Sequence, residues 1–268
     1  MPIGGENGQL LGLTGSRRGT LHMIEDCNVT THLPTVGIIG AGKLSLALAR
    51  LLLASGVEVR ISSTRPVEDL EWILDVLAPG ATAASTPELV SASDVVVLAL
   101  PLSKLGQLDA ASFSGKVVVD AMNHWFAVDG PLSALDRFAG TSSELVATML
   151  PGAELVKAFN HVGYHELEDL ALPANSPERI GMAVAGDEPQ SVARVSALVD
   201  LAGFDPVYVG SLSESGPLDN GNQLFGATLP ATELRDRFHA AHANAYPVNK
   251  IPSQQERISS LSASTSAH

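Results

Sequence analysis

Short apolar runs alternate along this chain with longer stretches in which apolar residues recur at helical spacing. The short runs predict strands buried on both faces of a parallel sheet, and the longer stretches predict the helices that cover it. The predicted strands are residues 36–39, 58–61, 82–84, 94–100, 116–120, 154–159, 180–185 and 206–209. The predicted helices are residues 43–55, 68–77, 103–108, 145–150, 188–202 and 223–237, with a short helix after Thr86.

The pattern also divides the chain into one folded domain with two tails. Residues 35–232 carry the alternation and form the predicted domain. Residues 1–34 are rich in glycine and have no sustained period, so we predict a flexible lead. Residues 233–268 are predicted to be a flexible tail, rich in Ser, Ala and Gln beyond Pro247. A native start at Met23 instead of Met1 stays open, and the N-terminal mass of native material would decide it.

A glycine turn follows the first predicted strand and opens the first predicted helix. Gly40 permits a tight turn, and Gly42 has no side chain to keep a diphosphate away from the backbone N–H groups of the helix. In this context the motif predicts a doubly wound, mostly parallel sheet, the Rossmann NAD(P)-binding fold. The residues predicted to bind the dinucleotide here are Gly40, Ala41, Gly42, Lys43, Leu44 and Ser45, where Ser45 replaces the usual Gly or Ala.

The end of the second strand indicates which dinucleotide is bound. An NAD site would place Asp or Glu there to accept from the ribose 2′-hydroxyl. This chain instead has Ser63, Thr64 and Arg65. Hydroxyls and a guanidinium match a 2′-phosphate, so we predict NADP(H) as the cofactor. The alternative is that Arg65 is an exposed loop cation before Pro66.

Composition restricts the function classes. The net charge of −13 argues against nucleic acid or an anionic membrane as a partner, and we expect small-molecule substrates instead. No apolar run is long enough to span a bilayer. Cys27 is the only cysteine, which excludes an intramolecular disulfide and a thiolate metal cluster. A soluble protein in the reducing cytoplasm is the simplest expectation.

Polar residues follow the strands predicted at residues 116–120 and 154–159, where an open α/β sheet binds its ligands. Asn123 and Asn160 are predicted to contact the dinucleotide, although each amide could instead cap its own turn. His124 could hydrogen-bond a second substrate or give it a proton, or face solvent. Leu100 and Pro101 are predicted to line the same crevice. Trp125 and Phe126 could stack on a flat ring, but we favour the core for them.

Two other patterns are given structural interpretations. His161 and His165 have the i, i+4 spacing of a metal pair, but no third ligand is fixed by the pattern, so we predict no metal site. Lys157 lies within an apolar strand and is interpreted as an edge residue that extends its charged end to water.

Several segments together resemble the NADPH-dependent F-420 reductase family, the deazaflavin-linked NADP oxidoreductases, and more distantly the reductase domain of six-transmembrane metalloreductases. These segments are residues 40–45, 63–65, 94–101 (DVVVLALP), 118–123 (VVDAMN), 150–160 (LPGAELVKAFN) and 216–224. They extend over residues 35–226, nearly the whole predicted domain. Residues 123–125 (NHW) depart from the less polar segment that is usual in archaeal members.

The resemblance implies a specific reaction. Hydride would pass between C4 of the nicotinamide and C5 of the deazaflavin coenzyme F-420, which requires neither a nucleophile nor a metal. The residues that we predict to act at this crevice are His124, Asn123 and His161. Two alternatives stay open: an NADPH-dependent reductase of a small imine or carbonyl compound with His124 as proton donor, and a non-catalytic NADP(H) sensor. The apolar segment 218–229 would suit the contact surface of a homodimer.

Overall fold

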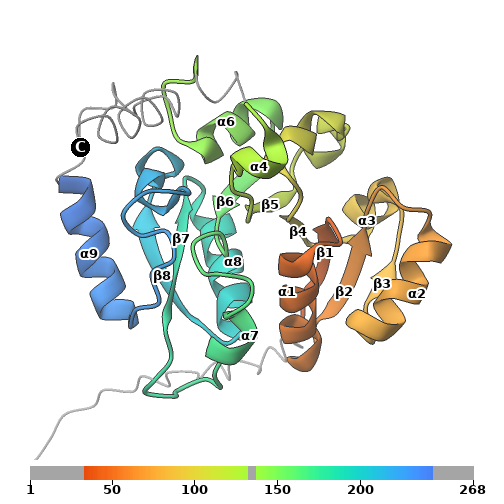
Figure 1. Cartoon of the computed structure of the whole chain (residues 1–268), viewed down its shortest axis with the longest axis horizontal. Helices are drawn as coiled ribbons and strands as arrows, with labels where there is room; N and C mark the ends of the chain where they lie inside the picture. The colour runs from red at the N-terminus through yellow and green to blue at the C-terminus, as the bar shows by residue number, and fades with distance from the viewer. Residues whose placement is uncertain (1–32, 132–136, 244–268) are drawn as a thin grey trace, which may run out of the picture. The chain divides into compact units, whose positions relative to one another are not determined.

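The computed structural model describes residues 33–131 and 137–243, and in this part the chain folds into one eight-stranded sheet with helices on both faces (Figure 1). The predictions for residues 1–32 and for the chain beyond residue 243 lie outside the described residues. The strands are β1 Thr35–Ile39, β2 Glu58–Ser62, β3 Thr82–Ala83, β4 Val95–Leu98, β5 Val117–Asp120, β6 Glu154–Lys157, β7 Gly181–Gly186 and β8 Asp205–Gly210.

The strand order is β3-β2-β1-β4-β5-β6-β7-β8. Strands β1 to β6 pair in parallel, β7 is antiparallel to β6, and β8 is parallel to β7. The order reverses between β1 and β4, which makes the carboxyl ends of these two strands the topological switch point. The predicted doubly wound, mostly parallel sheet of the Rossmann type is therefore confirmed.

The connections are mostly helical. The α-helices are α1 Lys43–Ala54, α2 Val67–Leu77, α3 Thr86–Ala92, α4 Phe126–Asp129, α6 Ser142–Met149, α7 Leu167–Leu170, α8 Pro189–Leu201 and α9 Ala231–Ala243. Four 3₁₀ turns are also present in the described part: η1 Leu102–Gln107, η2 Ala110–Phe113, η3 Leu212–Glu214 and η4 Gly216–Leu218.

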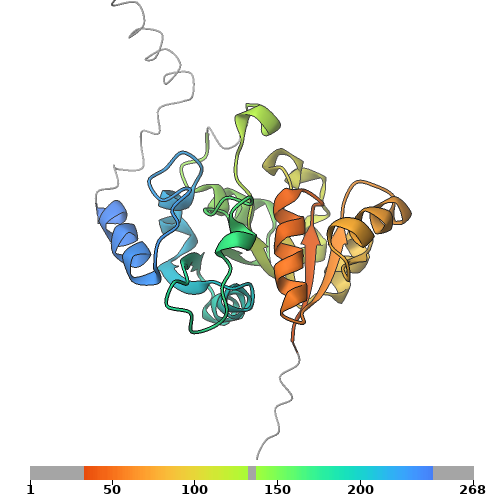
Figure 2. The same cartoon turned by 60° about the horizontal axis from the view of Figure 1, so that its bottom comes forward.

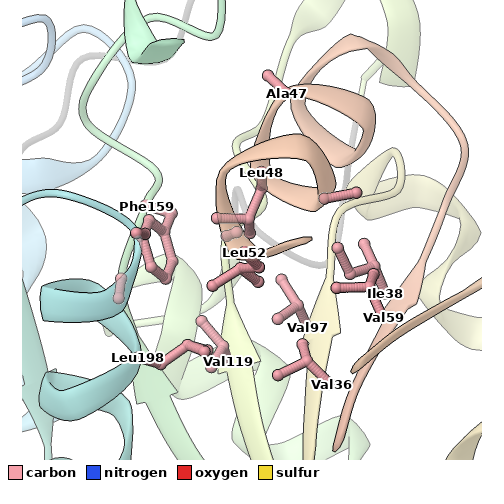
Figure 3. Close-up of a cluster of buried hydrophobic side chains, with 14 of the residues drawn as sticks. Val36, Ile38, Ala47, Leu48, Leu52, Val59, Val97, Val119, Phe159 and Leu198 are labelled. Carbon is pink, nitrogen blue, oxygen red and sulfur yellow. The ribbon is translucent and has the colours of Figure 1, made fainter. Parts of the chain in front are cut away.

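The strands are apolar on both faces because both faces are covered. On one face α1, α2 and α8 pack against alternate residues of the strands, and Leu48 and Leu52 of α1 lie close to Val97 and Val119 (Figure 3). On the other face α3, α6, η1 and η2 cover the remaining strand residues, such as Val96 and Val118. A third cluster joins α9 to β7 and β8. Continuous apolar runs such as residues 95–98 are therefore buried throughout.

Gly37 in the middle of β1 allows a helix to approach the sheet closely. A Cβ atom added at Gly37 would lie 2.3 Å from Leu89 Cδ2 of α3 and 2.5 Å from Ser93 Oγ. Any side chain here would push α3 away from β1. Glycine at this position therefore allows α3 to pack close to the sheet.

Two predictions about elements are wrong. The helix predicted over residues 223–237 instead runs from Ala231 to Ala243, after a series of turns. Its Leu234 and Phe238 are buried against β7 and β8, so the domain does not end at residue 232 and the predicted tail cannot begin at 233. The helix predicted over residues 103–108 is the 3₁₀ turn η1, which Gly106 and the short loop favour over an α-helix.

Candidate functional site

The glycine turn after β1 lies at the switch point of the sheet. Gly40 has φ +118°, and a Cβ atom added to it would lie 2.2 Å from the carbonyl oxygen of Ala99, just after β4. The Gly40 N–H also donates to Ser62 O over 2.8 Å. Only glycine can adopt this backbone conformation at such a close contact, so Gly40 seats the turn between the ends of β2 and β4.

The N-terminus of α1 opens directly after this turn. Gly42 is the N-cap residue and supplies no side chain to the first N–H groups of the helix. No heavy atom lies within 4 Å of a Cβ atom built on Gly42, and the first turn contains no acidic residue. Lys43 is exposed beside it. These N–H groups are therefore not bound by a capping side chain, and a helix N-terminus of this kind can bind an anion.

Ser45 has a packing role. Its side chain is completely buried, and its Oγ donates to the carbonyl oxygen of Ala99 over 3.3 Å. The small side chain allows α1 to approach β4, which is the role of the third motif position. Direct contact of the Ser45 side chain with a dinucleotide is not supported, because that side chain faces the protein interior.

The predicted 2′-phosphate site is accessible. Ser63 follows β2, and its Oγ accepts from the Arg65 backbone N–H over 3.1 Å, which shapes the turn. Thr64 and Arg65 are exposed. No hydrogen bond or ion pair of the Arg65 guanidinium is found within residues 33–131 and 137–243. The guanidinium is thus available to a ligand anion at the end of β2, next to the glycine turn.

The loop after β4 completes this side of the crevice. Leu100 is half-buried and Pro101 is exposed, and both lie between β4 and η1. A Cβ atom added to Gly40 would be 3.3 Å from the Leu100 nitrogen. The backbone therefore brings Leu100 beside the glycine turn, as predicted.

Asn123 and Asn160 are brought together from the ends of β5 and β6. Asn123 Nδ2 donates to Asn160 O over 2.8 Å, and Asn160 Nδ2 donates to Asn123 Oδ1 over 3.3 Å. Asn160 Nδ2 also donates to Leu218 O over 2.9 Å. The two amides hold adjacent strand ends together, and Asn160 is nearly completely buried. Both residues therefore position the crevice, in addition to any contact with a ligand.

His124 lies in the loop after β5 and is half-buried. Its Nε2 lies 3.0 Å from the carbonyl oxygen of Gly130, so this nitrogen carries the proton and donates it. In the neutral ring Nδ1 is then an acceptor. Burial raises the pKa of the nearby Asp129 carboxyl, but hydrogen bonds from the backbone N–H groups of Ser103 and Trp125 outweigh burial, and this pKa lies below its ordinary value.

A turn from the end of the domain joins the two polar loops. Within residues 218–220, Leu218 O accepts from Asn160 and Asn220 Nδ2 donates to the carbonyl oxygen of His124 over 2.8 Å. Asp219, between them, bonds to Lys157 and Ser142. Three consecutive residues therefore bond to the β5 loop, the β6 loop and the N-terminus of α6.

Lys157 is fully buried, so its interpretation as an edge residue reaching water is wrong. Its Nζ donates to Ser142 Oγ (3.0 Å), Ser143 Oγ (2.8 Å) and Asp219 Oδ1 (2.8 Å). All three ammonium protons are thus used. Burial lowers the pKa of Lys157, but Asp219 and Asp120 outweigh it and the pKa lies above its ordinary value.

Asp120 completes this buried network. Its carboxylate accepts from Ser143 Oγ over 2.7 Å and from the Met122 N–H over 3.0 Å. Burial raises the pKa of Asp120, and Lys157 offsets this only in part. The network lies directly before the residues that form the crevice, and the sequence pattern did not reveal it.

His161 has a structural position, so its predicted catalytic role is not supported. The side chain is completely buried, and its Nε2 accepts from the backbone N–H of Ala183 in β7 over 3.0 Å. The ring proton is therefore on Nδ1, on the side of the Ala227 backbone. Burial lowers the pKa of His161 to about 4. His165 is exposed, with its Nε2 4.0 Å from Glu166 Oε2.

Trp125 and Phe126 are not core residues, contrary to the favoured interpretation. They are 48% and 51% exposed, in the loop after β5 and at the start of α4. Trp125 makes an edge contact with Phe225, with ring centroids 5.6 Å apart. An aromatic surface thus lies beside His124, available to a flat ligand.

Tyr164 is a residue that the sequence reasoning missed. It follows β6, yet its hydroxyl lies 3.4 Å from Lys43 Nζ, at the glycine turn. Nζ is also 5.3 Å from the centroid of the Tyr164 ring. The available signal was an aromatic residue shortly after a strand end that was already predicted to line the crevice.

A shallow cavity on the described surface lies away from these residues. It is lined by Arg60, Ala83, Ala84, Pro87, Glu88, Ser91 and Ala92, beside β3 and α3. It shares none of the predicted site residues, and it is not at the switch point. We therefore place the candidate site at the glycine turn, where the open helix N-terminus and the strand ends meet.

Other kinds of site are not seen in the described residues. Within residues 33–131 and 137–243, no group of three or more His, Cys, Asp or Glu side chains is arranged to hold a metal ion. In the same part of the chain, no helix has both the length and the apolar composition needed to cross a membrane.

Solved structures show the same fold. The hypothetical protein SMa0349 from Sinorhizobium meliloti is 29% identical, with a TM-score of 0.63, over 74% of this chain and 96% of that protein. A candidate F420-dependent NADP reductase from Arthrobacter sp. FB24 is 20% identical, with a TM-score of 0.55, over 68% of this chain and 87% of that one.

Sequence comparison is more local. Protein YjhV of Escherichia coli K12 is 50% identical over 44 residues, which are 16% of this chain and 32% of that protein. The chain thus matches about a third of this relative.

Residues 35–124 match the family model described as "NADP oxidoreductase coenzyme F420-dependent". The matched range includes the glycine turn, the Ser63 to Arg65 segment and the β5 loop as far as His124. The resemblance predicted from the sequence is therefore confirmed over residues 35–124, the part of the chain that matches this family model.

Proposed function

We propose that this chain is an oxidoreductase that transfers a hydride between NADP(H) and the deazaflavin coenzyme F-420. The proposed binding of NADP(H) rests on one observation: Ser63, Thr64 and Arg65 are accessible at the end of β2, beside a helix N-terminus without a capping side chain. The description of the matching family model supports the deazaflavin half.

The choice of NADP(H) over NAD(H) follows from charge. No acidic residue stands among residues 63–65, so a ribose 2′-hydroxyl has no carboxylate acceptor there. The Arg65 guanidinium has no hydrogen bond or ion pair in the described part of the chain, and it can bind a 2′-phosphate through two parallel hydrogen bonds. The diphosphate would lie on the N–H groups after Gly42, near Lys43.

The residues proposed to bind the deazaflavin lie after two other strands, β5 and β6. Bound NADPH supplies the hydride at nicotinamide C4, so the protein needs to align two flat rings and exclude water. The Asn123–Asn160 pair fixes the ends of β5 and β6, and Trp125 and Phe126 provide exposed aromatic surface beside them. Asn123 and His124 are proposed to contact the reacting rings. Asn160 is proposed to hold Asn123 in position through their hydrogen bonds.

The environment of His124 favours this reaction over reduction of an imine or carbonyl compound. That alternative needs His124 to give a proton to the substrate, but the Nε2 proton is already donated to Gly130 O. In the neutral ring Nδ1 has no proton to give. Hydride transfer to a deazaflavin requires no acid from the protein, since the accompanying proton can come from solvent.

The direct test is spectrophotometry of the purified full-length protein with NADPH and oxidised coenzyme F-420. We expect equimolar loss of both absorbances, since NADPH, the oxidised deazaflavin and one proton give NADP⁺ and the reduced deazaflavin. A preparation that binds NADPH but leaves the deazaflavin oxidised would contradict the acceptor assignment. NADPH binding without turnover of a deazaflavin, imine or carbonyl acceptor, together with a ligand-dependent change of assembly, would favour the sensor.

The proposal also covers the cellular compartment and the oligomeric state. We propose that the enzyme acts in the cytoplasm on these two small molecules, and that residues 218–229 include a surface for a second copy of the chain. Leu218 and Leu224 of that segment are buried within the protein, so its half-buried residues would have to form the contact. Light scattering of the purified protein would determine its oligomeric state.

A further inference from the structure

The segment that follows β6 lies along α1 and is held there by two polar contacts. Figures 1 and 2 both place α7 beside α1. Arg50 of α1 donates from Nε and Nη2 to the Glu168 carboxylate over 2.7 and 2.5 Å. Lys43, two turns earlier on α1, contacts Tyr164. The segment from Tyr164 to Glu168 therefore follows α1 toward the glycine turn.

Tyr164 fixes the position of the Lys43 ammonium. Nζ lies 5.3 Å from the Tyr164 ring centroid and 3.4 Å from its hydroxyl oxygen. The contact with the ring is a cation–π interaction at a distance where it is attractive. Lys43 is an exposed side chain, so this contact restricts the positions that its charge can take.

The Tyr164 hydroxyl has a proton left to donate. Its oxygen accepts from Lys43 Nζ, and in the described residues no acceptor for its own proton is found. Tyr164 is 43% exposed, so the hydroxyl is accessible. A single phosphate oxygen at the glycine turn could accept from both the Lys43 ammonium and the Tyr164 hydroxyl.

We propose that Tyr164 is a further dinucleotide-binding residue, which acts with Lys43 to bind the diphosphate at the glycine turn. The inference rests on the proposed NADP(H) function and adds to it a residue from outside the segment that matches the family model, which ends at position 124. It also explains why an aromatic residue with a hydroxyl is seated against a lysine that the glycine motif alone does not require.

The test compares ligands that contain different parts of NADPH. Binding of NADPH, 2′-phospho-ADP-ribose and adenosine 2′-monophosphate is measured by calorimetry for the wild type, Tyr164→Phe and Tyr164→Ala. Tyr208→Phe is the matched control, because this exposed tyrosine of β8 also has a hydroxyl contact of 3.4 Å, to Gly186 O. Thermal unfolding of each variant verifies the fold.

Tyr164→Phe keeps the ring under Lys43 and removes only the hydroxyl. A hydrogen bond to a charged group is worth enough that we expect about tenfold weaker binding of NADPH and of 2′-phospho-ADP-ribose. Adenosine 2′-monophosphate, which has no diphosphate, should bind all variants equally. Tyr164→Ala should weaken the binding of NADPH further, because the ring contact that positions Lys43 is also removed.

Two results would overturn the assignment. Unchanged NADPH affinity in both Tyr164 variants would show that the residue does not contact the dinucleotide. Equal losses for NADPH and adenosine 2′-monophosphate would indicate that Tyr164 only supports the fold. If the wild type itself does not bind NADPH, the proposed function fails first, which distinguishes that failure from an error about Tyr164 alone.

Discussion

Asp120 and Lys157 lie opposite each other as register partners on β5 and β6, and Ser143 connects them. Ser143 Oγ accepts from Lys157 Nζ over 2.8 Å and donates to Asp120 Oδ2 over 2.7 Å. Both charged side chains are buried, and Asp219 provides the second carboxylate. The network therefore connects the centre of the sheet to the turn that holds the crevice loops.

Replacing Lys157 by Met should strongly destabilise the protein. The change removes the only cation of the network and leaves the two carboxylates without a counter-ion, which costs about 3–5 kcal/mol for a buried pair. Urea unfolding at pH 7 measures the loss. Lys104→Met, at an exposed lysine of η1, is the control and should stay within about 0.5 kcal/mol of wild type. A loss of similar size in both variants would contradict this account of Lys157.

Burial of His161 predicts a specific dependence of stability on pH. The folded pKa of about 4 lies below the ordinary value of 6.5, so the unfolded chain binds a proton before the folded one does. The stabilisation is present above pH 6.5 and is lost as pH falls toward 4. Between pH 7 and pH 5 we expect His161 to account for a decrease of about 2 kcal/mol in the free energy of unfolding.

His161→Gln isolates this contribution. Glutamine can still accept from the Ala183 N–H but does not titrate. Urea unfolding of both proteins at pH 7 and pH 5 should give a clearly smaller decrease for the variant. The same decrease in both proteins would mean that His161 is not the group responsible.

Arg65→Ala should alter cofactor preference. Loss of a charge-assisted contact with two hydrogen bonds should cost on the order of 2 kcal/mol in NADP(H) affinity and little in NAD(H) affinity. Arg60→Ala is a suitable control, because Arg60 is on β2, the strand that precedes Arg65, but is paired with Glu58. Calorimetric titration with both dinucleotides gives the two affinities. Equal weakening for both would show that Arg65 does not bind the 2′-phosphate.

His124→Gln tests whether His124 acts as a general acid, while keeping the hydrogen bond that holds its loop. Glutamine can donate to Gly130 O as His124 does, but it cannot act as a general acid. If the acceptor is a deazaflavin, kcat should remain within about threefold of wild type, because the protein supplies no proton. A drop of about 10² or more, the usual contribution of an acid catalyst, would instead favour an imine or carbonyl substrate.

The fold could be predicted from the sequence because its signals are local. The runs at residues 36–39 and 95–98 and the glycine turn each lie within a few residues, and each is found in the structure. The last helix was misplaced because it is only weakly amphipathic, and the turns at residues 219–226 interrupt the pattern before it.

Within the candidate site, the sequence could predict the positions of residues that follow a strand, but not the contacts that depend on distant residues. Gly40, Arg65 and Asn123 follow strands directly, so the topology alone places them at the crevice. The role of Lys157 depends on Asp219, 62 residues later, and that of Tyr164 on Lys43, 121 residues earlier. His161 also follows a strand, yet its ring turns inward to β7. Position in the sequence does not reveal that direction.

The turn at residues 218–220 has a consequence for how the protein is made. The strands around the glycine turn, β1, β2 and β4, precede β5 in the chain, whereas the bonds to Asn160, Lys157 and His124 all come from a turn beyond β8. A nascent chain that ends before this turn has none of these three connections. The loops after β5 and β6 therefore acquire these bonds only after the turn at residues 218–220 has been synthesised.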